Sequence, residues 1–87
     1  MNIKWSPQSA GKANSITVID DNTLEIDGEQ YAFPTDIVQF DASGPVLEAH
    51  RDSGGELYVT VLRQYVGGNW PSWDNAEYNP VQPGVIR

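Results

Sequence analysis

Residues 46–65 read VLEAHRDSGGELYVTVLRQY, and this stretch decides the fold class. Two runs of alternating apolar and polar residues flank a turn sequence, DSGG, which predicts a β-hairpin. A three-residue loop over residues 53–55 pairs Asp52 with Glu56, whereas a two-residue loop would mix apolar with polar residues on each face. The three-residue loop gathers Leu47, Ala49, Leu57, Val59 and Val61 on one face and Glu48, His50, Tyr58 and Thr60 on the other.

The segment before this hairpin predicts a three-stranded meander over residues 15–33. A three-residue loop over residues 20–22 would join its first two strands, with Asn22 in the left-handed conformation that asparagine tolerates. Asp27-Gly28 is the strongest short hairpin signal in the chain and would join the second strand to the third. The two turns agree on one apolar face: Ile16, Val18, Leu24, Ile26, Tyr31 and Phe33.

Glycine, proline and asparagine interrupt the chain every few residues, and no segment keeps a helical period over three turns. We therefore predict one all-β domain, built as a small antiparallel sheet or open barrel from the meander and the hairpin. Residues 1–13 would form an N-terminal arm, residues 14–65 the antiparallel β domain, and residues 66–87 an irregular Trp/Pro-rich C-terminal segment that crosses it. Residues 34–45 would link the meander to the hairpin irregularly or through a short helical turn, and a short strand over residues 37–40 is the alternative.

The composition narrows the class of function. Twelve acidic residues against five basic ones give a formal net charge of −7, which argues against binding nucleic acid through phosphate contacts. The chain has no cysteine, so neither a disulfide nor a thiolate metal site is available. Neither a signal peptide nor a stretch long enough to span a membrane is evident, so a cytoplasmic protein without membrane contact is expected.

No arrangement of residues in the sequence predicts catalysis. His50 is the only histidine, and we expect it on an exposed strand face beside Tyr58. A small enzyme that uses His50 with a carboxylate remains an alternative, although no nucleophile elbow accompanies it. The acidic turn at residues 20–22 lacks the spacing of a calcium loop, and neither glycine pair forms a phosphate loop. A non-enzymatic protein without cofactor or metal is therefore expected.

The C-terminal segment carries the main candidates for a binding surface, Trp70, Trp73 and Tyr78. Tryptophan and tyrosine are enriched at binding hot spots because they bury a large area at a low entropy cost. The three rings are candidates for a protein-binding surface, and a carbohydrate-binding platform is the alternative. They could instead cover an open end of the sheet and complete a small core. Self-association of the chain is left open.

Residues 46–65 followed by Trp70, together with Asp27-Gly28-Glu29 ahead of Tyr31 and Phe33, resemble small proteins encoded in phage and prophage tail-gene clusters. The likeness covers about half of the chain and consists mostly of strand and turn pattern. That group has no settled activity, so the resemblance implies no catalytic residues. It implies a small accessory protein of tail or tail-fibre assembly, or a minor virion component, with a tail protein as partner.

Overall fold

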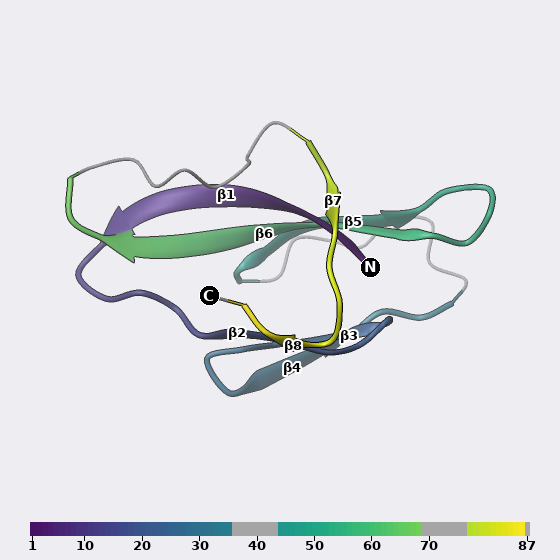
Figure 1. Cartoon of the computed structure of the whole chain (residues 1–87), viewed down its shortest axis with the longest axis horizontal. Coiled ribbons are helices and arrows are strands. Elements are labelled where there is room, and N and C mark those ends of the chain that lie inside the picture. The colour runs from purple at the N-terminus through teal and green to yellow at the C-terminus, as the bar shows by residue number, and fades with distance from the viewer. Residues whose placement is uncertain (36–43, 69–76, 87) are drawn as a thin grey trace.

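A computed structural model describes residues 1–35, 44–68 and 77–86, which form two four-stranded sheets (Figure 1). Sheet A has the order β5 (Val46–Arg51), β6 (Leu57–Val66), β1 (Asn2–Ala10) and β7 (Asn79–Pro80). Sheet B has the order β4 (Glu29–Ala32), β3 (Thr23–Ile26), β2 (Ile16–Asp20) and β8 (Gly84–Val85). The all-β prediction is confirmed. None of the described residues belongs to a helix that could cross a membrane.

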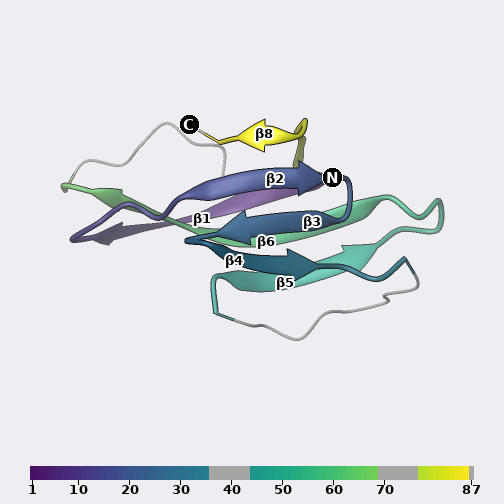
Figure 2. The same cartoon turned by 90° about the horizontal axis from the view of Figure 1, so that it is seen from below.

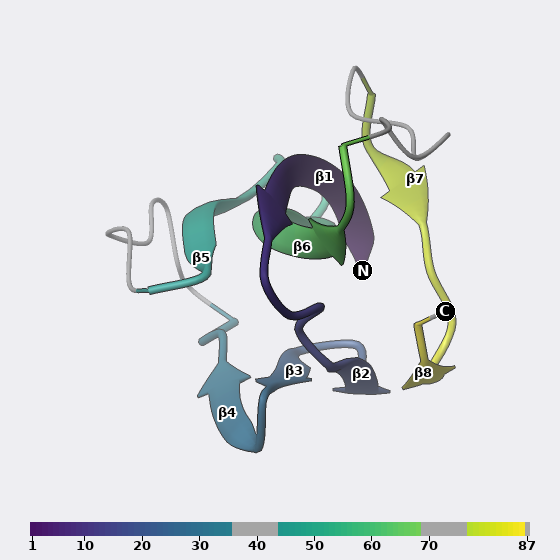
Figure 3. The ribbon, with the colours of Figure 1, turned by 90° about the vertical axis from the view of Figure 1, so that its left-hand side faces the viewer.

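The two sheets lie face to face, as the views from below and from one end show (Figures 2 and 3). The C-terminal segment passes along one side, pairing through β7 with sheet A and through β8 with sheet B. The Val81 amide donates to the Met1 carbonyl at 3.0 Å, and the Ile86 amide donates to the Ile16 carbonyl at 2.9 Å. The predicted crossing of the domain by this segment is confirmed for the residues described.

The meander forms in the predicted register. Val18 pairs with Leu24, and the β3–β4 turn at Asp27-Gly28 pairs the strands as expected. Both turn residues have positive φ, 51° and 84°, which is the signature of a type I′ turn. The inward side chains are buried, with Tyr31 partly buried at the edge of the core: Ile16, Val18, Leu24, Ile26 and Phe33.

The tip of the first hairpin differs from the prediction. Asp20, rather than Ile19, pairs with Thr23, so the loop contains two residues, and the register shifts between Val18 and Asp20. Ile19 is the extra residue of this bulge and is 41% exposed. Asn22 is not among the described residues with positive φ; its amide instead donates to the Asp20 carboxylate at 2.8 Å. Because the bulge adds one residue to β2, the loop is one residue shorter than predicted.

The β5–β6 hairpin keeps the predicted pairs of Ala49 with Val59 and, at its tip, Asp52 with Glu56. The placement of Leu47 in the apolar face is wrong. A register shift between Val46 and Glu48 puts Val46 opposite Val61, where Val46 is fully buried, and leaves Leu47 40% exposed. The bulge lies on an edge strand, where such irregularities hinder pairing with another chain.

The N-terminal arm predicted for residues 1–13 is largely a strand of sheet A. β1 runs parallel to β6 from Asn2 to Ala10 and buries Met1, Ile3 and Trp5. Because the Met1 carbonyl faces β7, odd-numbered residues of β1 turn their backbone groups to that side. Pro7 is on this side as well, but it lies beyond the short β7. Its lack of an N–H therefore costs no strand-pairing hydrogen bond within the described residues.

The two ends of the molecule are closed by different side chains. At one end Arg51 of β5 donates to the carbonyls of Phe33 and Pro34, to the Asn22 side chain and to the Gly55 carbonyl, at 2.8–3.2 Å. These bonds join sheet A to two segments of sheet B. Near the other end, Asn14 donates to the Leu62 carbonyl and accepts from the Gln64 amide, each at 2.8 Å. Asn14 thus ties the β1–β2 connection to β6.

Candidate binding surface on the outer face of sheet A

The outer face of sheet A carries three neighbouring rings, His50, Tyr58 and Tyr78, which we call the aromatic cluster. His50 and Tyr58 are paired across β5 and β6, and their rings stack with centroids 5.4 Å apart and planes at 10°. Tyr78, which directly precedes β7, meets both rings nearly at right angles, with centroids 5.3 Å from Tyr58 and 5.9 Å from His50. Such edge-to-face contacts are favourable for aromatic quadrupoles.

Polar contacts fix the two rings of the hairpin. His50 Nδ1 lies 3.0 Å from Glu48 Oε1, and the Tyr58 hydroxyl donates to Asp52 Oδ2 at 3.2 Å. Glu48 and His50 occupy the outer face of the same strand, two residues apart, which brings their side chains together. Each carboxylate therefore restrains one ring, Glu48 from the edge strand β5 and Asp52 from the hairpin tip.

The third ring is held from the middle of the sheet. The Tyr78 hydroxyl lies 3.2 Å from Thr60 Oγ1, and Lys4 Nζ lies 4.9 Å from the centroid of the Tyr78 ring. Thr60 and Lys4 are paired across β6 and β1, so both side chains belong to the same outer face. The distance of Lys4 is that of a cation–π contact.

The Asp52 carboxylate accepts several hydrogen bonds at the hairpin tip. Its Oδ1 accepts from the Glu56 amide at 3.0 Å and the Gly54 amide at 2.9 Å, while its Oδ2 accepts from Tyr58. These donors, the Glu56 amide foremost, hold the pKa of Asp52 below its ordinary value. The same carboxylate raises the pKa of Tyr58, because it accepts a hydrogen bond from the protonated hydroxyl and repels the phenolate.

Of the three predicted binding residues, the structure describes Tyr78. Tyr78 lies in the aromatic cluster and is partly buried. Trp70 and Trp73 lie outside the described residues. His50 stands beside Tyr58 with 36% of its side chain exposed, so this placement is confirmed. The alternation of β5 and β6 predicted the His50–Tyr58 pair, whereas no local pattern indicated that Tyr78 would reach them.

The surroundings of His50 bear on the enzyme alternative. Glu48 orients the imidazole as an acidic residue orients a catalytic histidine, but the ring contacts described are to Glu48, Tyr58 and Tyr78. The two nearby hydroxyls are already engaged, Tyr58 with Asp52 and Tyr78 with Thr60. In the described ranges no three His, Cys, Asp or Glu residues are grouped so as to hold a metal.

The fold and this surface define a small all-β module with a partly exposed aromatic cluster on one sheet. Comparisons with protein-family models, with curated proteins and with solved structures gave no match to the chain.

Proposed function

We propose that the chain is a non-enzymatic protein-interaction module that binds a partner through the outer face of sheet A. The aromatic cluster carries this proposal. Tyr58 and Tyr78 are partly exposed, and each is held by a hydrogen bond, so little side-chain entropy remains to be lost on binding. Tyrosine is one of the residue types in which binding hot spots are enriched.

The distribution of charge supports a basic partner. Arg63 is buried, and Arg51 is engaged with carbonyl groups, so two of the cations contribute little to the surface. The acidic side chains that border the aromatic cluster, Glu48 and Asp52, are exposed. With a net charge of −7, the chain would attract a cationic surface at long range and associate more slowly as salt is added.

The biological setting that we propose comes from the resemblance to phage tail-cluster proteins. The module acts as an accessory protein in tail or tail-fibre assembly, in the cytoplasm of the infected cell or as a minor part of the virion. A phage tail component with a basic patch is the partner that fits both the resemblance and the charge.

A carbohydrate partner fits this surface less well. Sugar recognition by an aromatic side chain requires an open ring face. The Tyr78 ring carries Lys4 over it at 4.9 Å and meets Tyr58 and His50 edge to face. The cluster thus offers ring edges and hydroxyl groups, which suit a protein surface better than a sugar ring.

Site-specific photo-crosslinking tests the proposal. A benzoylphenylalanine residue at position 48 lies on the outer face of sheet A, while one at position 30 lies on the outer face of sheet B, and both native side chains are exposed. In lysate of the native host we expect the same crosslinked protein repeatedly from position 48 and not from position 30. Equal crosslinking from both positions, or from position 30 alone, would remove sheet A as the binding face.

A further inference from the structure

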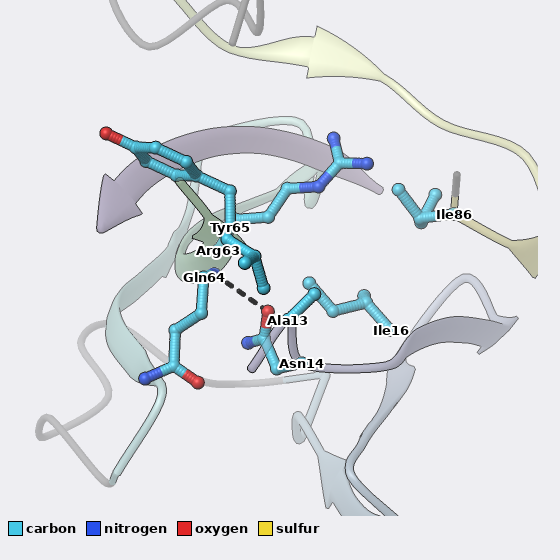
Figure 4. Close-up of a pocket in the computed structure, with 8 residues that line it drawn as sticks. Ala13, Asn14, Ile16, Arg63, Gln64, Tyr65 and Ile86 are labelled. Carbon is cyan, nitrogen blue, oxygen red and sulfur yellow. Dashed lines mark hydrogen bonds between the residues drawn. The ribbon is translucent and has the colours of Figure 1, made fainter. Parts of the chain in front are cut away.

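A pocket of 310 Å³ lies between the sheets, but its one cation is already engaged (Figure 4). Arg63 and Val66 of β6 line it opposite Ile16 and Ile86. The Arg63 guanidinium lies 4.7 Å from the centroid of the Trp5 ring and makes a further contact. Among the residues described, this pocket therefore offers a ligand no available charge. Exposed carboxylates, by contrast, border the aromatic cluster.

The side chains of His50 and Glu48 form a pair at this border, on the edge strand β5. Nδ1 of His50 lies 3.0 Å from Oε1 of Glu48, and the two side chains are 36% and 48% exposed. Because an ionised carboxylate can only accept, Nδ1 carries the proton. While the imidazole is neutral, this bond occupies one carboxylate oxygen without cancelling the negative charge. Oε2 of Glu48 has no hydrogen-bond donor within the described part of the chain.

The imidazole of His50 also has one face that no described ring covers. Tyr58 stacks on the face that points towards β6, with the ring planes at 10°. Tyr78 is closer to Tyr58 than to His50, with centroids 5.3 Å and 5.9 Å away, so it does not lie on the opposite face. Since β5 is the last strand of sheet A on this side, that opposite face points away from the sheet. The pair therefore presents a flat ring face beside a carboxylate oxygen.

We propose that this pair receives an arginine side chain of the partner, whose guanidinium lies on the uncovered imidazole face and donates to Glu48. A guanidinium is planar, stacks on flat rings and matches a carboxylate with its fork of donors, whereas a lysine ammonium is a point charge. The inference rests on the proposed function, because it names the group through which a basic partner contacts the outer face of sheet A.

Protonation of His50 releases this arginine. The imidazolium compensates the carboxylate and repels the guanidinium, so a proton and the arginine compete for the same pair. Histidine is the side-chain type that ordinarily changes charge between about pH 5 and pH 8, whereas tyrosines such as Tyr58 and Tyr78 stay neutral there. Beyond these two rings lie Asp52, at the Tyr58 hydroxyl, and Lys4, over the Tyr78 ring. Affinity for the arginine therefore falls as the pH falls.

Amide NMR titrations with two blocked peptides, Gly-Arg-Gly-Arg-Gly and Gly-Lys-Gly-Lys-Gly, test this inference at fixed ionic strength. At about pH 7.5 we expect saturable shifts at residues 48–50 and 58, with the arginine peptide bound at least about threefold more tightly. At about pH 5.5 its affinity should be at least about threefold lower. Equal affinity for the two peptides would overturn the arginine contact, and an affinity that does not change with pH would overturn its release. No saturable shift at these residues would overturn the site.

The variants Glu48→Gln and Glu25→Gln form a matched pair, because each removes one negative charge and Glu25 lies on the outer face of sheet B. Glu48→Gln should weaken binding of the arginine peptide at least about threefold, whereas Glu25→Gln should bind as the wild type does. An equal loss in both variants would mean that net charge alone attracts the peptide, and would contradict the site.

Photo-crosslinking from position 48 separates this inference from the proposed function. The crosslinker replaces Glu48 itself, so capture of a partner there depends on the rest of the outer face and not on the arginine contact. A captured partner, together with no preference for the arginine peptide, would overturn the arginine contact and leave the interaction proposal standing.

Discussion

At the scale of single residues, Asp52 shows how one side chain both shapes a turn and holds part of a surface. Its carboxylate accepts from two loop amides and from the Tyr58 hydroxyl. The carboxylate of Glu56, which carries the same charge and is paired with Asp52, accepts from the Asn2 side chain at 2.8 Å instead. Each carboxylate at the hairpin tip therefore has its own hydrogen-bond donors, which offset the repulsion between the two negative charges.

The lowered pKa of Asp52 predicts a pH-dependent contribution to stability. A carboxylate whose pKa is lower in the folded state stabilises the fold above its ordinary value of 3.8 and loses this effect as the pH falls through the lowered pKa. The free energy of unfolding of the wild type should exceed that of Asp52→Asn by a constant amount above about pH 5, and the gap should narrow below about pH 4.

Urea unfolding at a series of pH values measures this gap. Asp21→Asn is the matched control, because Asp21 is an exposed aspartate in the neighbouring β2–β3 turn. A gap between wild type and Asp52→Asn that is as large at about pH 3 as at about pH 7 would contradict the prediction.

At the scale of elements, the strand pairs joined by short turns were predictable from the sequence, and the non-local pair was not. Alternation and turn residues determine a hairpin locally, so the pairs of β3 with both its neighbours followed from residues 15–33. β1 also alternates, with Met1, Ile3 and Trp5 inward, but its partner β6 lies more than fifty residues away. No local turn indicates such a parallel pair, and Pro7 obscured the pattern.

The two bulges could not be predicted for a related reason. A regular register without a bulge places Leu47 in the core, whereas the bulge places Val46 there. Because both residues are apolar, their order in the sequence does not distinguish the two registers. The aromatic cluster was partly predictable, because His50 and Tyr58 follow from the hairpin. The alternation of β6 predicts that Arg63 points inward. The pocket beside it was not predictable, because Ile86 of the C-terminal segment forms part of its wall.

The role of β1 as an interior strand makes a prediction about stability. Ile3 is fully buried between the sheets, so Ile3→Ala should cost about 2–5 kcal/mol, which is a large share of the stability of a domain this small. Gln8→Ala on the same strand is the control, because Gln8 is exposed. Thermal unfolding compares the two; an effect of Ile3→Ala no larger than that of Gln8→Ala would return residues 1–13 to the status of an arm.

At the scale of the whole molecule, the aromatic cluster lies on the outer face of sheet A, whereas a pocket lined by Arg63, Ile16 and Ile86 lies between the two sheets. The C-terminal segment joins them, because Tyr78 completes the cluster while Ile86 lines the pocket. Removing this segment would also remove β7 and β8, which pair with both sheets. Single substitutions therefore test binding more cleanly than a truncated chain.

The most direct test of the interaction proposal is the affinity of the crosslinked partner for the folded chain and two variants. Tyr78→Ala should weaken binding at least tenfold, because Tyr78 presents an ordered ring beside Tyr58 and His50. Gln30→Ala on the outer face of sheet B should bind as the wild type does, and added salt should slow association with the wild type. Unchanged affinity for a folded Tyr78→Ala, or an equal loss in Gln30→Ala, would contradict binding through sheet A.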